Sequence, residues 1–265
     1  MLGTAVIMVL TGLCVGILSG LLGIGGGMLM VPILRLIFGL DAHMATATSL
    51  FTIIPTSASG MSAHVRGRTC IPRLGLMMGL GGAVTSTLGV WLASRSPAIF
   101  IMGVTAAIIA YSSYNMLSKV IKGPKTKGGP VVVPNPDDYE LTPKRRVGAF
   151  LVGMCAGLGS GYCGVGGGFI MMPLMTSLLG VPMKLASGTS LIGIIILATP
   201  GVIEQMLLGN VNYLAGIMLA VGSIPGAVLG AKFNARVPER TLRLMLAGLL
   251  FIAAIMLVAK ELGLF

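Results

Sequence analysis

The sequence predicts an all-α integral membrane protein built from two homologous repeats of about five helical segments each. Of its 265 residues, 55% are hydrophobic and only 9% are charged, whereas a soluble domain carries about 25% charged residues. The segment 12–32 returns at 153–173, an offset of 141 residues, with 11 of 21 positions identical. Most identities are glycines, and each copy interrupts an apolar run with a glycine cluster. The chain therefore uses one membrane unit twice.

The repeats are predicted to occupy residues 1–118 and 147–265. Residues 119–146 between them are rich in proline, glycine and charge, which predicts a flexible cytoplasmic linker. Beyond the glycines, the 141-residue offset also pairs Ala45, Thr48, Ser49 and Leu50 with Ala186, Thr189, Ser190 and Leu191. We call residues related by this offset repeat mates.

Ten apolar runs supply the segments. They lie near 2–20, 27–40, 44–60, 70–93 and 97–118, and near 147–160, 168–180, 186–204, 211–233 and 240–260. A helix needs about 20 residues to span the hydrocarbon core, so 27–40 and 168–180 are too short. Both directly follow a glycine cluster. We expect broken or re-entrant helices there, because irregular backbone survives at membrane depth only inside protein or beside a wet cavity.

The net charge of +11 is concentrated near 66–73, 119–146 and 232–243. Placing these clusters in the cytoplasm follows the positive-inside rule, and this distribution argues against nucleic acid as a partner. The equivalent loops 61–73 and 203–212 then fall on opposite faces of the membrane. The repeats are therefore predicted to be inverted, as in many secondary transporters.

The glycine clusters predict an anion site. A helix that restarts after a break presents unpaired N–H groups and the positive end of its dipole. The alternative is close helix packing through small residues, but packing alone does not require the next segment to be short. The candidate substrate contacts are Gly25, Gly26, Gly27 and Met28, and their repeat mates Gly166, Gly167, Gly168 and Phe169.

Hydroxyl side chains open the third segment of each repeat. Thr48 and Ser49, with their repeat mates Thr189 and Ser190, can donate to an oxyanion without the cost of burying a lysine. The alternative is that they bond back to their own helices, as Ser and Thr often do in apolar helices. Both interpretations stay open at this point.

Other polar residues are expected to be peripheral. His43 and Lys184 are repeat mates ahead of the third segments, and we expect them to be solvated loop charges, the alternative being that either attracts an anion to the entrance. His64 is expected in the basic cytoplasmic loop. Cys14 and Cys155 are expected to be small buried side chains, the alternative being a soft lining for a sulfur-containing substrate.

The sequence disfavours an enzyme. It has no P-loop, no spacing typical of a metal site, and no carboxylate in the middle of an apolar run, so we expect neither cofactor nor metal. Ser19 and Ser160 stand beside glycines, but a nucleophile needs a base within hydrogen-bond reach. A purely structural membrane protein would not need broken helices.

The doubled element S-G-x-x-G-x-G-G-G-x-x-x-x-P, at 19–32 and 160–173, resembles the TauE/SafE family of sulfite-exporter-type membrane proteins. The A-x-x-T-S-L blocks and the glycines at 82–89 and 226–230 fit the same family. The resemblance covers nearly the whole chain. It implies a multipass inner (cytoplasmic) membrane protein that moves sulfite, sulfonates such as sulfoacetate, thiosulfate or related anions. The family's usual basic residue near the glycine-rich hairpin has no clear counterpart here.

The sequence thus predicts a secondary transporter that exports a small sulfur-containing anion, held at the membrane midplane between the two glycine turns. A passive anion channel on the same scaffold is the alternative, and flux saturation and counterflow distinguish the two. The expected partners are the substrate and the lipid bilayer, and a homodimer remains an open alternative.

Overall fold

The computed structural model describes residues 2–122, 135–234 and 236–261, and in these ranges it contains helices and no strand. The linker predicted at 119–146 therefore lies partly outside the described residues. The first repeat forms α1 (Leu2–Leu22), α2 (Gly27–Leu36), α3 (Ala42–Arg66), α4 (Pro72–Ser94) and α5 (Ala98–Lys122). A short 3-10 turn, Pro136–Asp138, precedes α6 (Pro143–Cys163), α7 (Gly168–Leu178), α8 (Met183–Leu207), α9 (Tyr213–Asn234) and α10 (Glu239–Glu261).

Among the described residues, four helices are long and apolar enough to cross a membrane: α1, α4, α8 and α9. The two segments predicted to be short are short. α2 has 10 residues and α7 has 11, about 15 Å of helix and half of a hydrocarbon core. The predicted interruption of the helix at each glycine cluster is thus confirmed.

Helix starts follow from local sequence. The Asp41 carboxylate accepts a hydrogen bond from the His43 N–H ahead of α3, and the Thr142 hydroxyl accepts from the Arg145 N–H at the start of α6. Asp and Thr are favoured at these positions because they satisfy N–H groups that the first turn leaves unpaired. α2 and α7 differ, because each begins after a glycine with no side-chain cap.

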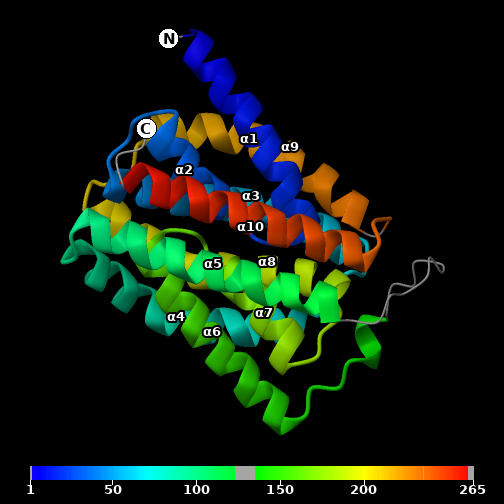
Figure 1. Cartoon of the computed structure of the whole chain (residues 1–265). Coiled ribbons are helices and arrows are strands. Elements are labelled where there is room, and N and C mark those ends of the chain that lie inside the picture. The colour runs from blue at the N-terminus through cyan, green and yellow to red at the C-terminus, as the bar shows by residue number, and fades with distance from the viewer. Residues whose placement is uncertain (1, 123–134, 235, 262–265) are drawn as a thin grey trace.

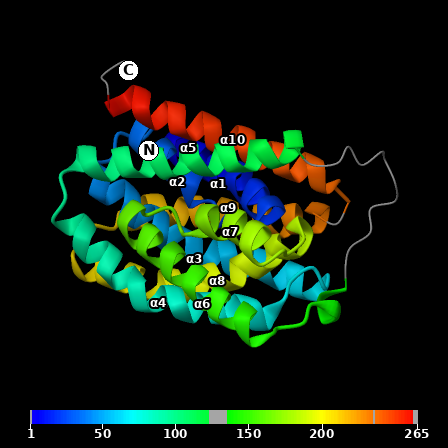
Figure 2. The same cartoon turned by 60° about the horizontal axis from the view of Figure 1, so that its bottom comes forward.

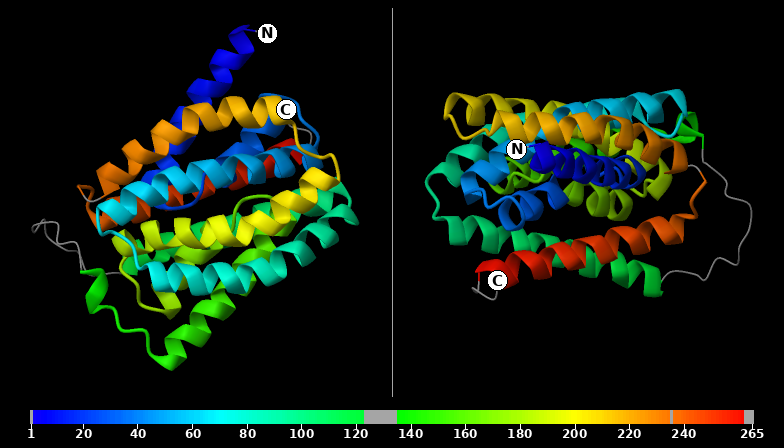
Figure 3. Two further views of the ribbon diagram at one scale, coloured as in Figure 1. Left: turned by 180° about the vertical axis from the view of Figure 1, so that it is seen from behind. Right: turned by 90° about the horizontal axis from the view of Figure 1, so that it is seen from above.

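The helices form two layers with the short helices between them. α9, α3, α8 and α4 lie side by side in that order, as the view from behind shows (Figure 3). α5 and α10 pack against each other on the opposite side (Figure 1). Figure 2 shows α7 between α5 and α8, and α2 likewise contacts both α10 and α3.

The two repeats interlock. α1 packs along α9 of the second repeat, and α6 packs along α4 of the first. Glycines make both contacts possible: Gly16 of α1 lies against the Ser223 backbone, and its repeat mate Gly157 lies against the Gly82 backbone. A Cβ at either position would collide with main-chain atoms. Because Ser223 and Gly82 are themselves repeat mates, the two interfaces are equivalent.

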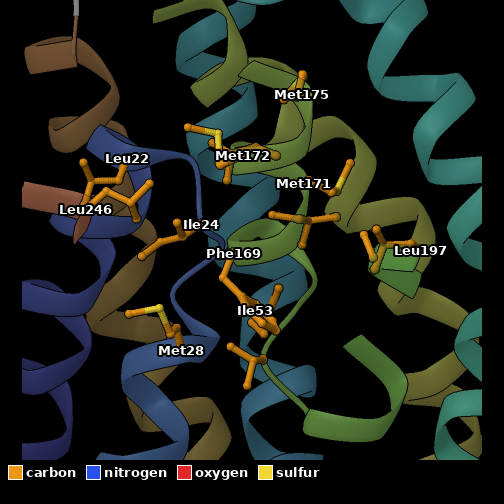
Figure 4. Packing of buried hydrophobic residues seen from close by; sticks show 14 of the residues in the cluster. Leu22, Ile24, Met28, Ile53, Phe169, Met171, Met172, Met175, Leu197 and Leu246 are labelled. Carbon is orange, nitrogen blue, oxygen red and sulfur yellow. The ribbon is translucent and has the colours of Figure 1, made fainter. Parts of the chain in front are cut away.

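The largest buried cluster surrounds the two glycine turns. Its fully buried side chains include Ile24, Met28, Ile53 and Phe169, which come from both repeats (Figure 4). The centre of the molecule is therefore the place where the two breaks meet.

Candidate functional site

The two turns have the same backbone form. Gly26 precedes α2 with φ 85°, and its repeat mate Gly167 precedes α7 with φ 66°. These values lie in the left-handed region, which side chains other than glycine rarely adopt. Glycine at these positions lets the chain end one helix, reverse and begin the next within a few residues. The sequence assigned both glycines to turns, and the structure places them there.

The turns pack against each other. A Cβ on Gly27 would lie 2.7 Å from the Val165 carbonyl oxygen, and one on Gly168 would lie 2.8 Å from the Ile24 carbonyl oxygen. Gly27 and Gly168 are repeat mates, as are Ile24 and Val165, so the contact is reciprocal. Two half-helices thus begin beside each other at the centre of the protein (Figure 4).

Apolar side chains close this centre. Residues 23–28 and 163–169 are all buried. Ile53 of α3 and its repeat mate Ile194 of α8 both lie against Gly25. Figure 4 shows Ile53 beside Phe169 at the turns. In the described state these side chains therefore bury the backbone of the turns.

The backbone N–H groups differ between the turns. The Gly168 N–H, predicted to face an anion, donates instead to the Gly166 carbonyl at 2.8 Å. In both turns the carbonyl before the helix accepts a hydrogen bond from the helix. The Gly26 carbonyl accepts from the Met30 N–H, and the Gly167 carbonyl accepts from the Met171 N–H. Among the other first N–H groups, those of Gly27 and Met28 in α2 and of Phe169 in α7 have no preceding helical turn to accept from them.

Two serines beside the turns were not among the substrate contacts predicted from the sequence. Ser19 and its repeat mate Ser160 are 0% exposed, and neither hydroxyl has a hydrogen-bond partner in the described structure. Ser19 Cβ lies 3.5 Å from the position of a Cβ on Gly26. Leaving a buried hydroxyl unpaired costs about 1–3 kcal/mol. The sequence does point to them, because Ser19 and Ser160 are among the residues that are identical in the two copies of the repeated element.

Thr48 and Thr189 join helices of different repeats. Thr48 Oγ1 accepts from the Asn212 N–H at 3.0 Å, and Thr189 Oγ1 accepts from the Ile71 N–H at 2.8 Å. Asn212 and Ile71 directly precede α9 and α4, and they are repeat mates. Both threonines therefore cap a helix across the repeat boundary, a role that the sequence does not predict.

Ser49 and Ser190 both contact the first glycine turn, at residues 23–27. The Ser49 hydroxyl donates to the Gly27 carbonyl at 3.3 Å, and the Ser190 hydroxyl donates to the Gly23 carbonyl at 2.5 Å. In this state both hydroxyls hold the backbone of the first turn, and that of Ser49 lies at the start of α2.

Lys184 corrects one expectation. It was expected to be a solvated loop charge, but it lies in the first turn of α8, is only 3% exposed and is engaged in an interaction there. Ser187, one turn later, lies against Gly23 of the first turn. His43, the repeat mate of Lys184, is partly exposed. A buried lysine therefore lies on the helix that borders the first glycine turn.

His64 corrects another expectation. It lies at the end of α3 and is 0% exposed, rather than in a solvated loop. Its Nε2 is 2.8 Å from the Gly20 carbonyl oxygen and its Nδ1 is 2.7 Å from Thr69 Oγ1. The repeat mates of His64 and Thr69 are Gln205 and Asn210, which bond to each other at 2.8 Å. The imidazole thus fills a structural position that an amide fills in the second repeat.

The cysteine expectation was also wrong. Cys14 and Cys155 are exposed free thiols, whereas Cys70 and Cys163 are buried. Cys14 and Cys155 are exposed on α1 and α6 and lie outside the buried cluster that surrounds the turns.

Comparison with known proteins agrees with this architecture. The chain is 31% identical over 229 residues to the probable membrane transporter protein YdhB of Bacillus subtilis, covering 86% of this chain and 89% of that protein. It is 29% identical over 259 residues to the probable membrane transporter protein YunE of the same organism, covering 89% and 91%. A relative in Methanocaldococcus jannaschii, the probable membrane transporter protein MJ0441, is 26% identical over 261 residues, covering 92% and 91%.

No solved structure matches the chain. The sequence profile described as Sulfite exporter TauE/SafE matches residues 8–257. With its multipass helical fold and its doubled glycine turn, the chain belongs to the TauE/SafE family of membrane transporters.

Proposed function

We propose that this protein is a secondary transporter that exports a small sulfur-containing oxyanion, such as sulfite, a sulfonate or thiosulfate, across the cytoplasmic membrane. One observation carries the proposal. Two half-helices begin beside each other at the buried centre, and beside them two serine hydroxyls lack any partner in the described structure. A fully buried hydroxyl without a partner is costly, and an anion that accepts from it removes that cost.

The chemistry of the centre suits an oxyanion. Helix starts offer N–H groups and a positive dipole end, and hydroxyls donate to oxygen. The centre provides these donors twice, through Ser19 with the α2 start and Ser160 with the α7 start. Lys184 adds a buried positive charge on α8. The two equivalent half-sites lie in different repeats, so a substrate between them contacts both halves of the protein.

The occluded centre supports a carrier over a channel. The turn residues are fully buried, and Ile53 and Ile194 pack on them from α3 and α8. A carrier opens such a site to one side at a time, which inverted repeats accomplish when one element moves against another. An inside-negative potential favours the exit of an anion by about 2.3 kcal/mol per charge for each 100 mV. Export therefore needs no relay of carboxylates.

Efflux from proteoliposomes tests this proposal. The protein is reconstituted with radiolabelled sulfite, thiosulfate or sulfoacetate inside, and efflux is followed under an imposed potential. We expect saturable efflux of at least one anion, and counterflow when the unlabelled anion is outside. Flux that rises linearly with concentration without counterflow would establish a channel. No flux of any of the three anions would reject the sulfur-anion assignment.

A further inference from the structure

The second repeat carries an apolar groove on its outer surface, which we call the α6/α7 groove. Its volume is about 380 Å³, within the range of small-molecule sites. Leu151 and Cys155 of α6 form one wall, and Leu174 and Leu178 of α7 form the other. Leu151 is 54% exposed and Leu178 is 69% exposed, so the groove opens to the surroundings of the protein. In a membrane these surroundings are lipid.

One end of this groove is basic. Lys144 and Arg145, in the first turn of α6, line it together with the apolar residues. The Arg145 guanidinium is held in place, because it donates to the Glu140 carbonyl at 2.9 Å and lies 4.7 Å from the Tyr139 ring centre. A guanidinium has five N–H donors and is well suited to a phosphate.

The length of the groove matches one leaflet. The lining residues run along α6 from Lys144 to Cys155, which at 1.5 Å per residue is about 16 Å. Half of a hydrocarbon core of about 30 Å is about 15 Å. An acyl chain whose headgroup lies at the level of Lys144 therefore extends along the whole groove.

The first repeat contains the equivalent groove without the charges. The α1/α2 groove has a volume of about 440 Å³ and is lined by Leu10, Cys14, Ile33 and Ile37, the repeat mates of the residues above. The repeat mates of Lys144 and Arg145 are Gly3 and Thr4. The chain thus presents two similar apolar grooves, and only one of them has a cationic end.

We propose that the α6/α7 groove binds an anionic glycerophospholipid, with its phosphate at Lys144 and Arg145 and an acyl chain along Leu151 and Cys155. Basic pockets between membrane helices favour anionic headgroups, at about fivefold in affinity for each cation near the surface. The α1/α2 groove takes acyl chains without distinguishing headgroups. This proposal does not depend on which solute the protein transports.

The two exposed cysteines report on the two grooves within one molecule. The full-length protein in non-ionic detergent is titrated with phosphatidylglycerol or phosphatidylcholine and labelled with N-ethylmaleimide. Peptide mass spectrometry then gives the labelling rates of Cys155 and Cys14. We expect phosphatidylglycerol to slow labelling of Cys155 relative to Cys14, and phosphatidylcholine to leave the ratio unchanged. Equal protection of both cysteines by phosphatidylglycerol, or equal protection of Cys155 by the two lipids, overturns the proposal.

Two variants sharpen the test. In Lys144→Gln/Arg145→Gln, the phosphatidylglycerol concentration that half-protects Cys155 should rise about 30-fold, the product of two cations. In Gly3→Lys/Thr4→Arg, protection should appear at Cys14 as well, and this gain does not depend on the first variant folding normally. Unchanged protection in the first variant, or no protection of Cys14 in the second, contradicts the charge argument.

Discussion

Replacing Ser19 or Ser160 with alanine should raise the stability of the protein and lower its affinity for the substrate. Both hydroxyls are fully buried and unpartnered, so removing either one removes a desolvation cost on the scale of about 1–3 kcal/mol. We therefore expect the free energy of unfolding of Ser19→Ala and Ser160→Ala to be at least that of the wild type. The lower end of the scale corresponds to a gain of about 1 kcal/mol. Most buried substitutions have the opposite sign.

The same change should weaken substrate binding. A hydrogen bond to a charged group contributes about 1.5–3 kcal/mol, so losing one donor lowers the apparent affinity for the anion roughly 10- to 150-fold. Because the two serines belong to equivalent half-sites, each single variant should retain transport with a raised KM. The double variant should lose measurable transport at substrate concentrations that saturate the wild type.

The assay pairs thermal unfolding in detergent with concentration-dependent efflux from proteoliposomes. Ser113→Ala is the matched control, because the Ser113 hydroxyl is also buried but donates to the Ala247 carbonyl at 2.8 Å, between α5 and α10. It should lose stability and keep its KM. If Ser19→Ala is destabilised like this control and transports with an unchanged KM, the hydroxyl is a packing group and the half-site argument fails.

Three further predictions concern topology, helix capping and the buried cation. In a background without native cysteines, Asp137→Cys and Leu207→Cys should be labelled from opposite sides of the membrane by an impermeant maleimide; labelling from one side would reject the inverted arrangement. Thr189→Val removes the acceptor of the N–H that precedes α4 and should cost about 1–3 kcal/mol in thermal unfolding, whereas Thr189→Ser should not. Lys184→Gln should reduce substrate affinity at low and high ionic strength alike because Lys184 is buried, whereas His43→Gln should have a small effect that salt abolishes. An unchanged affinity in Lys184→Gln at both ionic strengths would make Lys184 structural.

The sequence predicted the architecture well because the repeat and the glycines are local signals. The short helices after each glycine cluster, and the left-handed backbone at Gly26 and Gly167, follow from segment length and residue type. The inverted orientation stays a prediction, since it depends on the membrane rather than on contacts within the chain. The positions of the hydroxyls at the starts of α3 and α8 were also predicted from the sequence.

Tertiary partners could not be read from the sequence. Thr48 and Thr189 cap helices from the other repeat, 164 and 118 residues away, and no local pattern indicates a bond of that separation. Lys184 and His64 stand at the ends of apolar runs, where solvation is the usual outcome, yet tertiary packing buries both. Ser19 and Ser160 were conspicuous in the repeated element, but only the structure reveals that their hydroxyls lack acceptors.

The exchange of partners between repeats has a consequence for biosynthesis. α1 is made first, but the helix that covers its glycine face, α9, ends at Asn234, more than 200 residues later. At about 5–20 residues per second, α1 waits on the order of 10–40 s for that surface. During this interval its close-packing face meets lipid or the insertion machinery. Ribosome stalling before α9 should therefore leave an N-terminal half that proteases digest readily, and supplying the second half as a separate chain should restore its resistance.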